Sequence, residues 1–274
     1  MKFVKMQGTG NDFVVIDDRN NLFLGKEEDL AKKICDRRFS VGGDGILLVR
    51  NSNVADIEMV IFNADGSYAE MCGNGIRCFA KYIYDEKIVH KLKISIQTGD
   101  GIKIAHITEN NGKAQNIKIN MGIPSFETSK IPALIDEEIV DYDLKVEDRN
   151  YKITSMLMGV PHTVVIGKLD EFQIEEGRAI EKNKKIFPKG TNVNFCQVIN
   201  GNYIKVKTWE RGAGATLACG TGCCAAAVAC NRLGLTSDNV DVEVPGGILH
   251  IDITETFVYM TGEAKTTFSG DADV

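Results

Sequence analysis

Alternating hydrophobic and polar side chains mark short strands in both halves of the chain. Residues 57–62 (IEMVIF) and 204–209 (IKVKTW) carry this pattern, as do the runs 93–97 (KISIQ), 101–107 (GIKIAHI) and 116–122 (NIKINMG). A period of two places one face of a strand against a core and the other toward solvent. The sequence therefore predicts a protein rich in half-buried strands.

Two other stretches carry helical patterns of different kinds. Residues 27–39 (EEDLAKKICDRRF) place Leu30 and Ile34 on one face and charges on the other, which predicts an outer amphipathic helix. Residues 223–230 (CCAAAVAC) have no polar face, which predicts a helix buried on all sides. Gly234 is placed to end this second helix.

A unit of strand, turn and helix occurs twice. The segments MCGNGIRCFA and LACGTGCCAA both read Cys-Gly-x-Gly before helix-forming residues, and their cysteines, Cys72 and Cys219, are 147 positions apart. The same offset aligns the predicted strands 57–62 and 204–209. An internal repeat of this length indicates two related halves, each built on the same unit.

Length and composition indicate a protein that acts on small molecules. The chain has 274 residues, enough for two cores, and 43% of them are hydrophobic against 26% charged. No apolar run approaches the roughly 18 residues of a membrane span. The N-terminus reaches polar residues too early for a signal peptide, which predicts a cytoplasmic protein with reduced thiols. A net charge of −6 without a basic block argues against nucleic acid or a membrane as partner.

The spacing of the eight cysteines and four histidines does not suit a metal. No CxxC pair occurs, and the histidines are scattered along the chain. We therefore expect no metal. Neither GTGND nor RGAGATLACGTG completes GxGxxG between a clear strand and helix, so we also expect no flavin or nicotinamide cofactor. Most of the cysteines are best interpreted as small core residues, namely Cys35, Cys78, Cys196, Cys223, Cys224 and Cys230.

Cys72 and Cys219 differ from the other cysteines because each precedes Gly-x-Gly at a predicted helix start. There the helix dipole favours a thiolate, and free backbone N–H groups can bind a carboxylate. If the two repeats face each other, one thiolate can remove a proton from one face of a carbon while the opposite thiol donates to the other face. This pattern predicts inversion at a carbon without a cofactor.

Four motifs together resemble the diaminopimelate epimerase family. They are GTGNDFVVID at 8–17, NADGSYAEMCGNGIRC at 63–78, GTNVNF at 190–195 and WERGAGATLACGTG at 209–222. The resemblance implies an α/β (α+β) fold of two pseudo-symmetric domains, each a sheet wrapped around a central helix, usually assembled as a homodimer. It implies an isomerase that needs no pyridoxal phosphate and interconverts LL- and meso-diaminopimelate, on the route to lysine and peptidoglycan.

Prolines and charges at 124–138 (PSFETSKIPALIDEE) predict a crossing between two lobes near residue 120. The resemblance implies that the tail from about residue 264 returns to the first lobe, and it implies residue roles. An N-terminal lobe of residues 1–119 plus 264–274 would carry Cys72, and a C-terminal lobe of residues 120–263 would carry Cys219. These cysteines would be the acid/base pair. The reacting end of the amino acid would be held by Asn11, Gly73, Asn74, Gly220 and Thr221. The distal end would be held by Asn63, Asn194, Glu210 and Arg211.

Three positions depart from the pattern of the family. Val160 stands where asparagine is frequent, Gly45 replaces a glutamine of some members, and Ala215 replaces a usual glutamate. Val160, Gly45 and His162 are candidate pocket-lining residues, and a packed neutral histidine is the alternative for His162. A racemase of another amino acid, such as histidine, is therefore the alternative function. A thiol redox or binding module, in which Cys72 and Cys219 form a switchable disulfide, is a further alternative.

Overall fold

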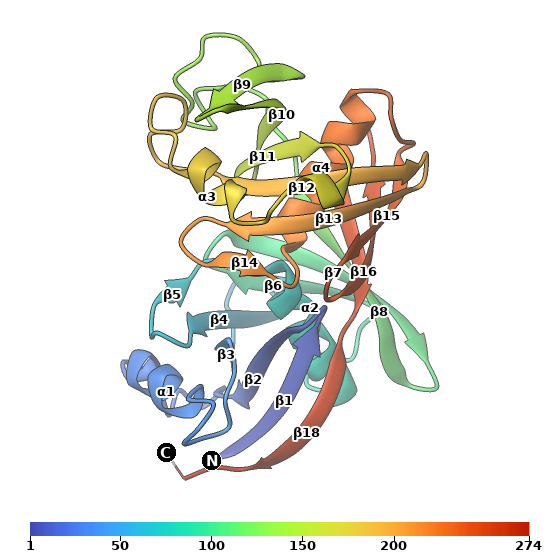
Figure 1. Cartoon of the computed structure of the whole chain (residues 1–274). Coiled ribbons are helices and arrows are strands. Elements are labelled where there is room, and N and C mark those ends of the chain that lie inside the picture. The colour runs from blue at the N-terminus through green and yellow to red at the C-terminus, as the bar shows by residue number, and fades with distance from the viewer. Residues whose placement is uncertain (274) are drawn as a thin grey trace. The chain divides into compact units, whose positions relative to one another are not determined.

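A computed structural model describes residues 1–273 of the chain, drawn in Figure 1. Its contacts divide the chain into two compact units. The first contains residues 1–119 together with the C-terminal segment from residue 261, and the second contains Asn120–Met260. Both units combine a sheet with two helices, so the predicted mixed α+β fold class is confirmed.

The sheet of the first unit is ordered by strand pairing rather than by sequence. Adjacent members of its sheet are, in order, β18 (Lys265–Asp271), β1 (Lys2–Gly8), β2 (Asn11–Asp17), β3 (Gly45–Arg50), β4 (Ile57–Asn63), β6 (Lys93–Thr98), β7 (Gly101–Asn110) and β8 (Lys113–Gly122). The short β5 (Tyr68–Ala69) also pairs with β4. Only β2–β3 and β4–β6 are parallel, and these connections contain the helices α1 (Glu27–Ile34) and α2 (Gly73–Asp85). The predicted strands in this unit are confirmed.

The second unit repeats this arrangement. Its pairing order is β9 (Tyr142–Val146), β10 (Arg149–Met158), β11 (Val160–Ile166), β12 (Asn192–Asn200), β13 (Tyr203–Glu210), β15 (Asn239–Val244) and β16 (Gly247–Ile253), with β14 (Gly214–Thr216) on β13. The parallel pairs β11–β12 and β13–β15 again enclose helices, α3 (Glu176–Glu181) and α4 (Gly220–Arg232). A 3-10 turn, η1 (Leu169–Glu171), precedes α3, and β17 (Val258–Glu263) follows β16.

Helices on both faces explain why β3 and the first five residues of β12 are buried. Every residue of β3 is buried. Ile46 and Leu48 join the cluster around α1, whereas Leu47 lies against the start of α2. In the second unit Val193 and Phe195 of β12 join the cluster around α3. The alternation of a strand then turns Asn194 to the opposite face, toward α4.

The two central helices have equal length and the predicted offset. Both α2 and α4 contain 13 residues, and they begin at Gly73 and Gly220. The run from Cys223 to Cys230 is buried, as expected for a helix without a polar face. Gly234 has φ 70° and follows the end of α4, which confirms its predicted role.

The predicted helix at residues 27–39 is too long. The helix ends at Ile34, and Leu30 and Ile34 form its buried side. The Asp36 carboxylate accepts hydrogen bonds from the backbone N–H groups of Arg38 and Phe39, at 2.8 and 2.9 Å. Such a local side-chain bond offers the backbone an alternative to helical hydrogen bonds, so the chain turns there.

Candidate active site

Both repeated cysteines are the residues that cap the central helices. Cys72 and Cys219 have extended backbones and are each followed by the first helical residue. The Cys72 sulfur accepts a hydrogen bond from the Gly75 N–H at 3.4 Å. The prediction that these two thiols lie at helix starts is confirmed.

The second glycine of each Cys-Gly-x-Gly motif leaves space for the side chains of neighbouring strands. A Cβ atom on Gly222 would lie 2.3 Å from Asn194 Oδ1, and one on Gly75 would lie 3.3 Å from Leu47. A side chain at Gly222 would therefore displace Asn194. The motif thus allows each helix start to approach its sheet closely.

In the first unit, Cys72 lies beside Asn11, whose side-chain amide is hydrogen-bonded to Asp44. The Cys72 sulfur is 3.6 Å from Asn11 Oδ1, and Asn11 Nδ2 donates to Asp44 Oδ2 at 2.6 Å. Asp44 also accepts from the Asp12 backbone N–H at 3.0 Å and from Arg37 at 2.7 Å. The sequence indicated Asn11 but gave no reason to select Asp44.

Asn74 is buried at the start of α2 and bonded within the same unit. The Thr9 hydroxyl donates to Asn74 Oδ1 at 3.1 Å, and the Arg77 guanidinium donates to the Thr9 hydroxyl at 2.7 Å. Arg77 also donates to the Gly73 carbonyl at 3.0 Å. These contacts hold the first turn of α2 rigidly, with the backbone of Gly73 and Asn74 beside Cys72.

In the second unit, a chain of hydrogen bonds leads to Cys219. The Thr208 hydroxyl donates to Asn194 Oδ1 at 3.1 Å, and Asn194 Nδ2 lies 3.1 Å from His162 Nδ1. His162 Nε2 lies 3.0 Å from Thr221 Oγ1, which is 3.5 Å from the Cys219 sulfur. The structure therefore brings together four residues that the sequence singled out separately.

The polarity of this chain follows from the state of His162. The imidazole is fully buried, and burial, with a smaller effect of Arg211, lowers the pKa of His162 to about 3. A neutral ring carries one proton, and Nδ1 accepts from the Asn194 amide, so that proton is on Nε2 and is donated to Thr221. The Thr221 hydroxyl proton can then be donated to the sulfur. Of the two interpretations of His162 considered from the sequence, the packed, neutral histidine is the one that the structure supports.

Glu210 is the charged neighbour of Cys219. Its carboxyl accepts a hydrogen bond from the Thr216 hydroxyl at 2.7 Å. Burial raises the pKa of Glu210, although Thr216 and the nearby Cys219 thiol both act to lower it. Burial, together with the Glu210 carboxylate, also raises the pKa of Cys219 well above its ordinary value.

The expected thiolate at the helix start is therefore wrong for Cys219 in this conformation. The Cys219 side chain is only 6% exposed. Removal from water destabilises a thiolate more than the end of one helix stabilises it. Cys219 is accordingly a thiol unless a ligand or a movement changes its surroundings.

The predicted distal-end residues lie in three different environments. Asn63 is exposed and donates to the Ser67 hydroxyl at 2.9 Å, as a turn residue would. Asn194 is fully buried in the chain that leads to Cys219. Arg211 is exposed, its backbone N–H donates to Asn192 Oδ1 at 2.8 Å, and its guanidinium donates to the Lys189 carbonyl at 3.0 Å.

Corresponding strand positions show where the two units differ. Asn11 and Val160 are the first residues of β2 and β11, so the amide beside Cys72 has an apolar counterpart in the second unit. Val160 is 38% exposed. Asn63 and Glu210 end β4 and β13 in the same way. The acceptor near Cys72, Asn11, therefore begins a strand, whereas the acceptor near Cys219, Glu210, ends one.

The backbone of the neighbouring strand leaves no room for a side chain at Gly45. It pairs with Asn63 in the β3–β4 ladder, and an added Cβ would lie 2.6 Å from the Phe62 carbonyl oxygen. A glutamine could not enter this position without moving the backbone. Gly45 thus contributes only main-chain atoms near Asn63.

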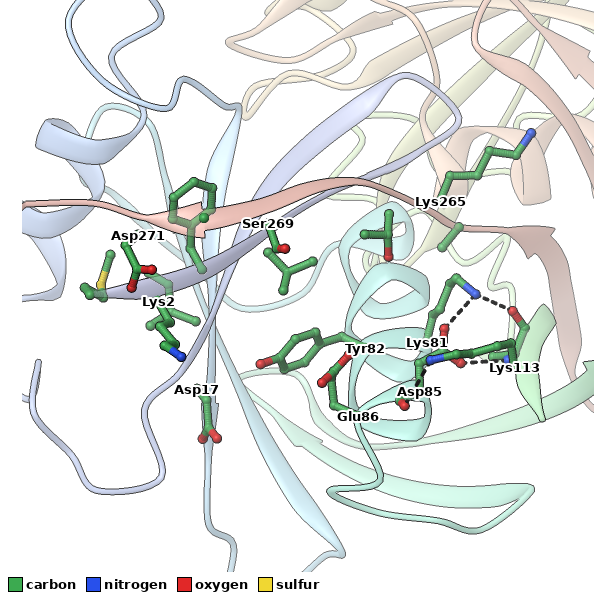
Figure 2. A pocket seen from close by; sticks show the side chains of 18 of the residues that line it. Lys2, Asp17, Lys81, Tyr82, Asp85, Glu86, Lys113, Lys265, Ser269 and Asp271 are labelled. Atoms are coloured by element: carbon green, nitrogen blue, oxygen red, sulfur yellow. Dashed lines mark hydrogen bonds and ion pairs between the residues drawn. The ribbon is translucent and has the colours of Figure 1, made fainter.

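A separate cavity of about 1270 Å³ lies in the first unit, beside the second half of α2 (Figure 2). Lys81, Tyr82 and Asp85 of α2, with Glu86 directly after the helix, line one side of it, and Lys265 of β18 contributes to another. Cys72 caps the opposite end of the same helix and does not line this cavity. The cavity therefore does not belong to the candidate thiol site.

Within residues 1–273, no group of three or more His, Cys, Asp or Glu side chains could hold a metal ion. No helix in the same range is long and apolar enough to cross a membrane.

The sequence did not indicate three residues that hydrogen-bond to candidate site residues. Asp44, Thr208 and Thr216 bond to the side chains of Asn11, Asn194 and Glu210, respectively. Asp44 is adjacent to the indicated Gly45, and Thr208 is two residues before the indicated Glu210. Their positions at strand ends were the available signal, but threonine and aspartate are too common there to be selected.

Comparison with known sequences gives one consistent result. A family model described as diaminopimelate epimerase matches residues 3–127 and 154–267. A diaminopimelate epimerase of Clostridium perfringens is 54% identical over 270 residues, which cover 98% of each chain. One of Caldanaerobacter subterraneus is 44% identical over the full length of both chains.

Solved structures resemble the fold at much lower sequence identity. A probable proline racemase from Agrobacterium radiobacter has a TM-score of 0.74 at 15% identity, covering 100% of this chain and 93% of the other. A phenazine biosynthesis protein of the PhzF family from Bacillus anthracis has a TM-score of 0.75 at 16% identity, covering 100% and 99%. At this identity the likeness concerns the fold alone.

Proposed function

Because the chain belongs to the diaminopimelate epimerase family, we propose that it interconverts LL- and meso-diaminopimelate, using Cys72 and Cys219 as its proton-transferring groups. The chain is an isomerase of the epimerase class. The observation that carries the two-thiol mechanism is the repeat itself. Two helices of equal length, at corresponding places in two units, are capped by cysteine.

The proposed chemistry needs one thiolate and one thiol at opposite faces of the α-carbon. The thiolate removes the α-proton, and the electron pair left on carbon is delocalised into the carboxylate. The other thiol then donates its proton to the opposite face, so the two sulfurs exchange protonation states in each turnover. Backbone N–H groups of Gly73, Asn74, Gly220 and Thr221 would stabilise the negative charge that develops on the carboxylate. No atom of pyridoxal phosphate or of a metal is needed in this scheme.

Recognition of the distal end is proposed to depend on Arg211 and Glu210. Arg211 is exposed and, within residues 1–273, bonds only one acceptor with its guanidinium, so further donors can bind a carboxylate in bidentate geometry. The Glu210 carboxyl can accept a hydrogen bond from an ammonium group. Asn63 and Asn194 are assigned to the same end by the resemblance. Asn63 is exposed and uses one amide N–H for Ser67, so its other N–H and its Oδ1 can bind substrate, whereas Asn194 is buried and bonded to His162 and Thr208.

Val160 is the observation that favours a second substrate. An exposed apolar side chain at the start of β11 offers no hydrogen bond to a charged distal group. A racemase of another amino acid, such as histidine, would tolerate this residue. The relatives with 54% and 44% identity are named diaminopimelate epimerases, and this supports diaminopimelate as the first choice.

A homodimer in the cytoplasm is proposed on the family resemblance. The substrate would be a small amino acid, and no nucleic acid or membrane would take part. Light scattering coupled to gel filtration would test the dimer, and a monomer at micromolar concentration would contradict it.

Proton exchange at the α-carbon tests the function directly. Purified protein is incubated in deuterium oxide with LL-diaminopimelate, histidine and other amino acids, without added pyridoxal phosphate. We expect deuterium in the product to accompany epimerisation of diaminopimelate. A higher kcat/KM for histidine would instead identify the alternative racemase, and reversible disulfide formation without exchange into any substrate would indicate the redox module.

A further inference from the structure

The amide of Asn11 has a fixed orientation beside Cys72. Its Nδ2 lies 2.6 Å from Asp44 Oδ2, and an ionised carboxylate accepts hydrogen bonds but cannot donate them. The group that faces Asp44 is therefore the NH₂ group. The carbonyl oxygen Oδ1 is left facing the Cys72 sulfur, at 3.6 Å.

This orientation decides which form of Cys72 fits best. A carbonyl oxygen offers only lone pairs, so a hydrogen bond between it and sulfur requires the S–H of a thiol. A thiolate at the same place would face the negative end of the amide dipole. A hydrogen bond that only the neutral form can donate disfavours ionisation.

Asp44 is itself held at several points. Oδ2 also accepts from the Asp12 backbone N–H, and Oδ1 accepts from Arg37 Nη2 at 2.7 Å. Its backbone N–H donates to the Asp12 carbonyl at 2.8 Å. The carboxylate therefore cannot turn away from Asn11 without breaking contacts to both Asp12 and Arg37.

The second unit has no counterpart of this arrangement. Val160 occupies the strand position of Asn11 and supplies no acceptor. Cys219 instead has the Thr221 hydroxyl at 3.5 Å, and the Glu210 carboxylate raises its pKa. Each sulfur also lies at a helix start, so the amide oxygen held in place by a carboxylate is the feature that distinguishes Cys72.

From these contacts we propose that Asp44 is a positioning residue for Cys72: by fixing the Asn11 amide it favours the protonated form of the Cys72 thiol. The inference rests on the proposed two-thiol mechanism, in which Cys72 is one of the two proton-transferring groups.

Charged groups near Cys72 can also change the pKa of its thiol, whatever the orientation of the Asn11 amide. Asp44 and Asp12 are negative, Arg37 and Lys5 are positive and pair with them, and α2 contributes Arg77 and the neutral, buried Cys78. Loss of a negative charge alone would also make a thiolate easier to form. The variants must therefore separate orientation from charge.

The test measures alkylation of each cysteine by iodoacetamide against pH, with peptides quantified by mass spectrometry. Asn11→Leu removes the acceptor and keeps every charge, and Asp44→Ala removes both oxygens that could fix the amide. We expect the pH of half-maximal alkylation of Cys72 to fall by about one unit in both variants, since one hydrogen bond to the thiol is lost. Cys219 in the same molecules is the internal control and should not shift.

Arg37→Met is the matched charge control, because it removes a cation from Asp44 and leaves the Asn11 contact in place. If the orientation of the Asn11 amide controls Cys72, the pH of half-maximal alkylation of Cys72 should change little in Arg37→Met. If charge alone controls it, this pH should rise, because a cation has been removed. The proposal is overturned if Asn11→Leu leaves Cys72 unchanged, or if Arg37→Met shifts Cys72 as far as Asp44→Ala does. Thermal melts identify unfolded variants, and Asp44→Glu, which keeps the charge but displaces the carboxylate, then replaces Asp44→Ala and should give the same fall.

Failure of this proposal is distinct from failure of the proposed function. The alkylation profile does not require turnover, so it reports on Asp44 whatever the substrate. Normal epimerisation by Cys72→Ala would reject the two-thiol mechanism while the contact between Asp44 and Asn11 stood unaffected.

Discussion

His162 Nε2 lies 3.0 Å from Thr221 Oγ1, and this hydroxyl lies 3.5 Å from the Cys219 sulfur. His162 is fully buried, so it acts on the thiol only through Thr221. The hydroxyl is therefore the last donor in a chain that begins at Thr208. Its removal tests whether the chain matters for proton transfer.

Thr221→Val should lower kcat while leaving the fold intact. Valine has nearly the same shape as threonine but cannot donate to the Cys219 sulfur. Loss of a hydrogen bond with a net value of about 0.5–1.5 kcal/mol predicts a fall in kcat of roughly 2- to 12-fold. Thr221→Ser keeps the hydroxyl and should restore most of the activity in steady-state assays. Equal activity of the valine and serine variants would contradict a role for the hydroxyl.

His162→Gln should weaken the dependence of stability on pH. The pKa of His162 is about 3 in the folded protein, against about 6.5 when unfolded, because burial disfavours the charged ring. A depressed pKa means that the unfolded state binds more protons between these values, so stability is complete above pH 6.5 and is lost as pH falls toward 3. The contribution is up to about 1.4 kcal/mol per pH unit in that window.

Urea unfolding at pH 7 and pH 5 measures this difference. The native chain should lose more stability between the two pH values than the glutamine variant does. His250→Gln, at a partly exposed position on β16, is the control. The same loss in the native chain and in His162→Gln would contradict a neutral, buried His162.

Cys72→Ala and Cys219→Ala should each abolish epimerisation. Removal of a positioned acid or base typically costs 10²–10⁴-fold, so each variant should fall by at least about a hundredfold in kcat. Cys224→Ala, on the same helix as Cys219 but away from its start, should retain activity. Circular dichroism would confirm that each variant is folded. Turnover near normal in either single variant would exclude the two-thiol mechanism.

Arg211→Met should reduce recognition of the distal carboxylate. Loss of a charge-assisted bidentate contact of about 1.5–3 kcal/mol predicts a fall in kcat/KM for LL-diaminopimelate of roughly 10- to 100-fold. The effect should appear mainly in KM if the contact is equally strong in substrate and transition state. Lys207→Met, which removes an exposed cation from β13, is the control for net charge. An unchanged kcat/KM would show that the distal group is bound elsewhere.

Local sequence patterns determined most of the fold and the positions of the two thiols. The period-two runs became β4, β6, β7, β8 and β13, and the repeated Cys-Gly-x-Gly motif became the starts of α2 and α4. These features depend on neighbours within a few residues, which a sequence displays directly. The helix at residues 27–39 was too long because Asp36, also a local feature, was not recognised as a turn former.

The tertiary structure decided which side chains meet at each thiol. Asp44 and Asn11 are 33 positions apart, and Asn194 and His162 are 32 apart. They meet because β2–β3 and β11–β12 are parallel pairs, whose register is set by long connections and not by adjacent residues. Burial also depends on the whole fold, and it raised the pKa of Cys219 where the helix start alone indicated a thiolate. The motif thus determined where the sulfurs lie, whereas packing determined their hydrogen-bond partners and the protonation of Cys219, since desolvation arises only when distant strands close over a group.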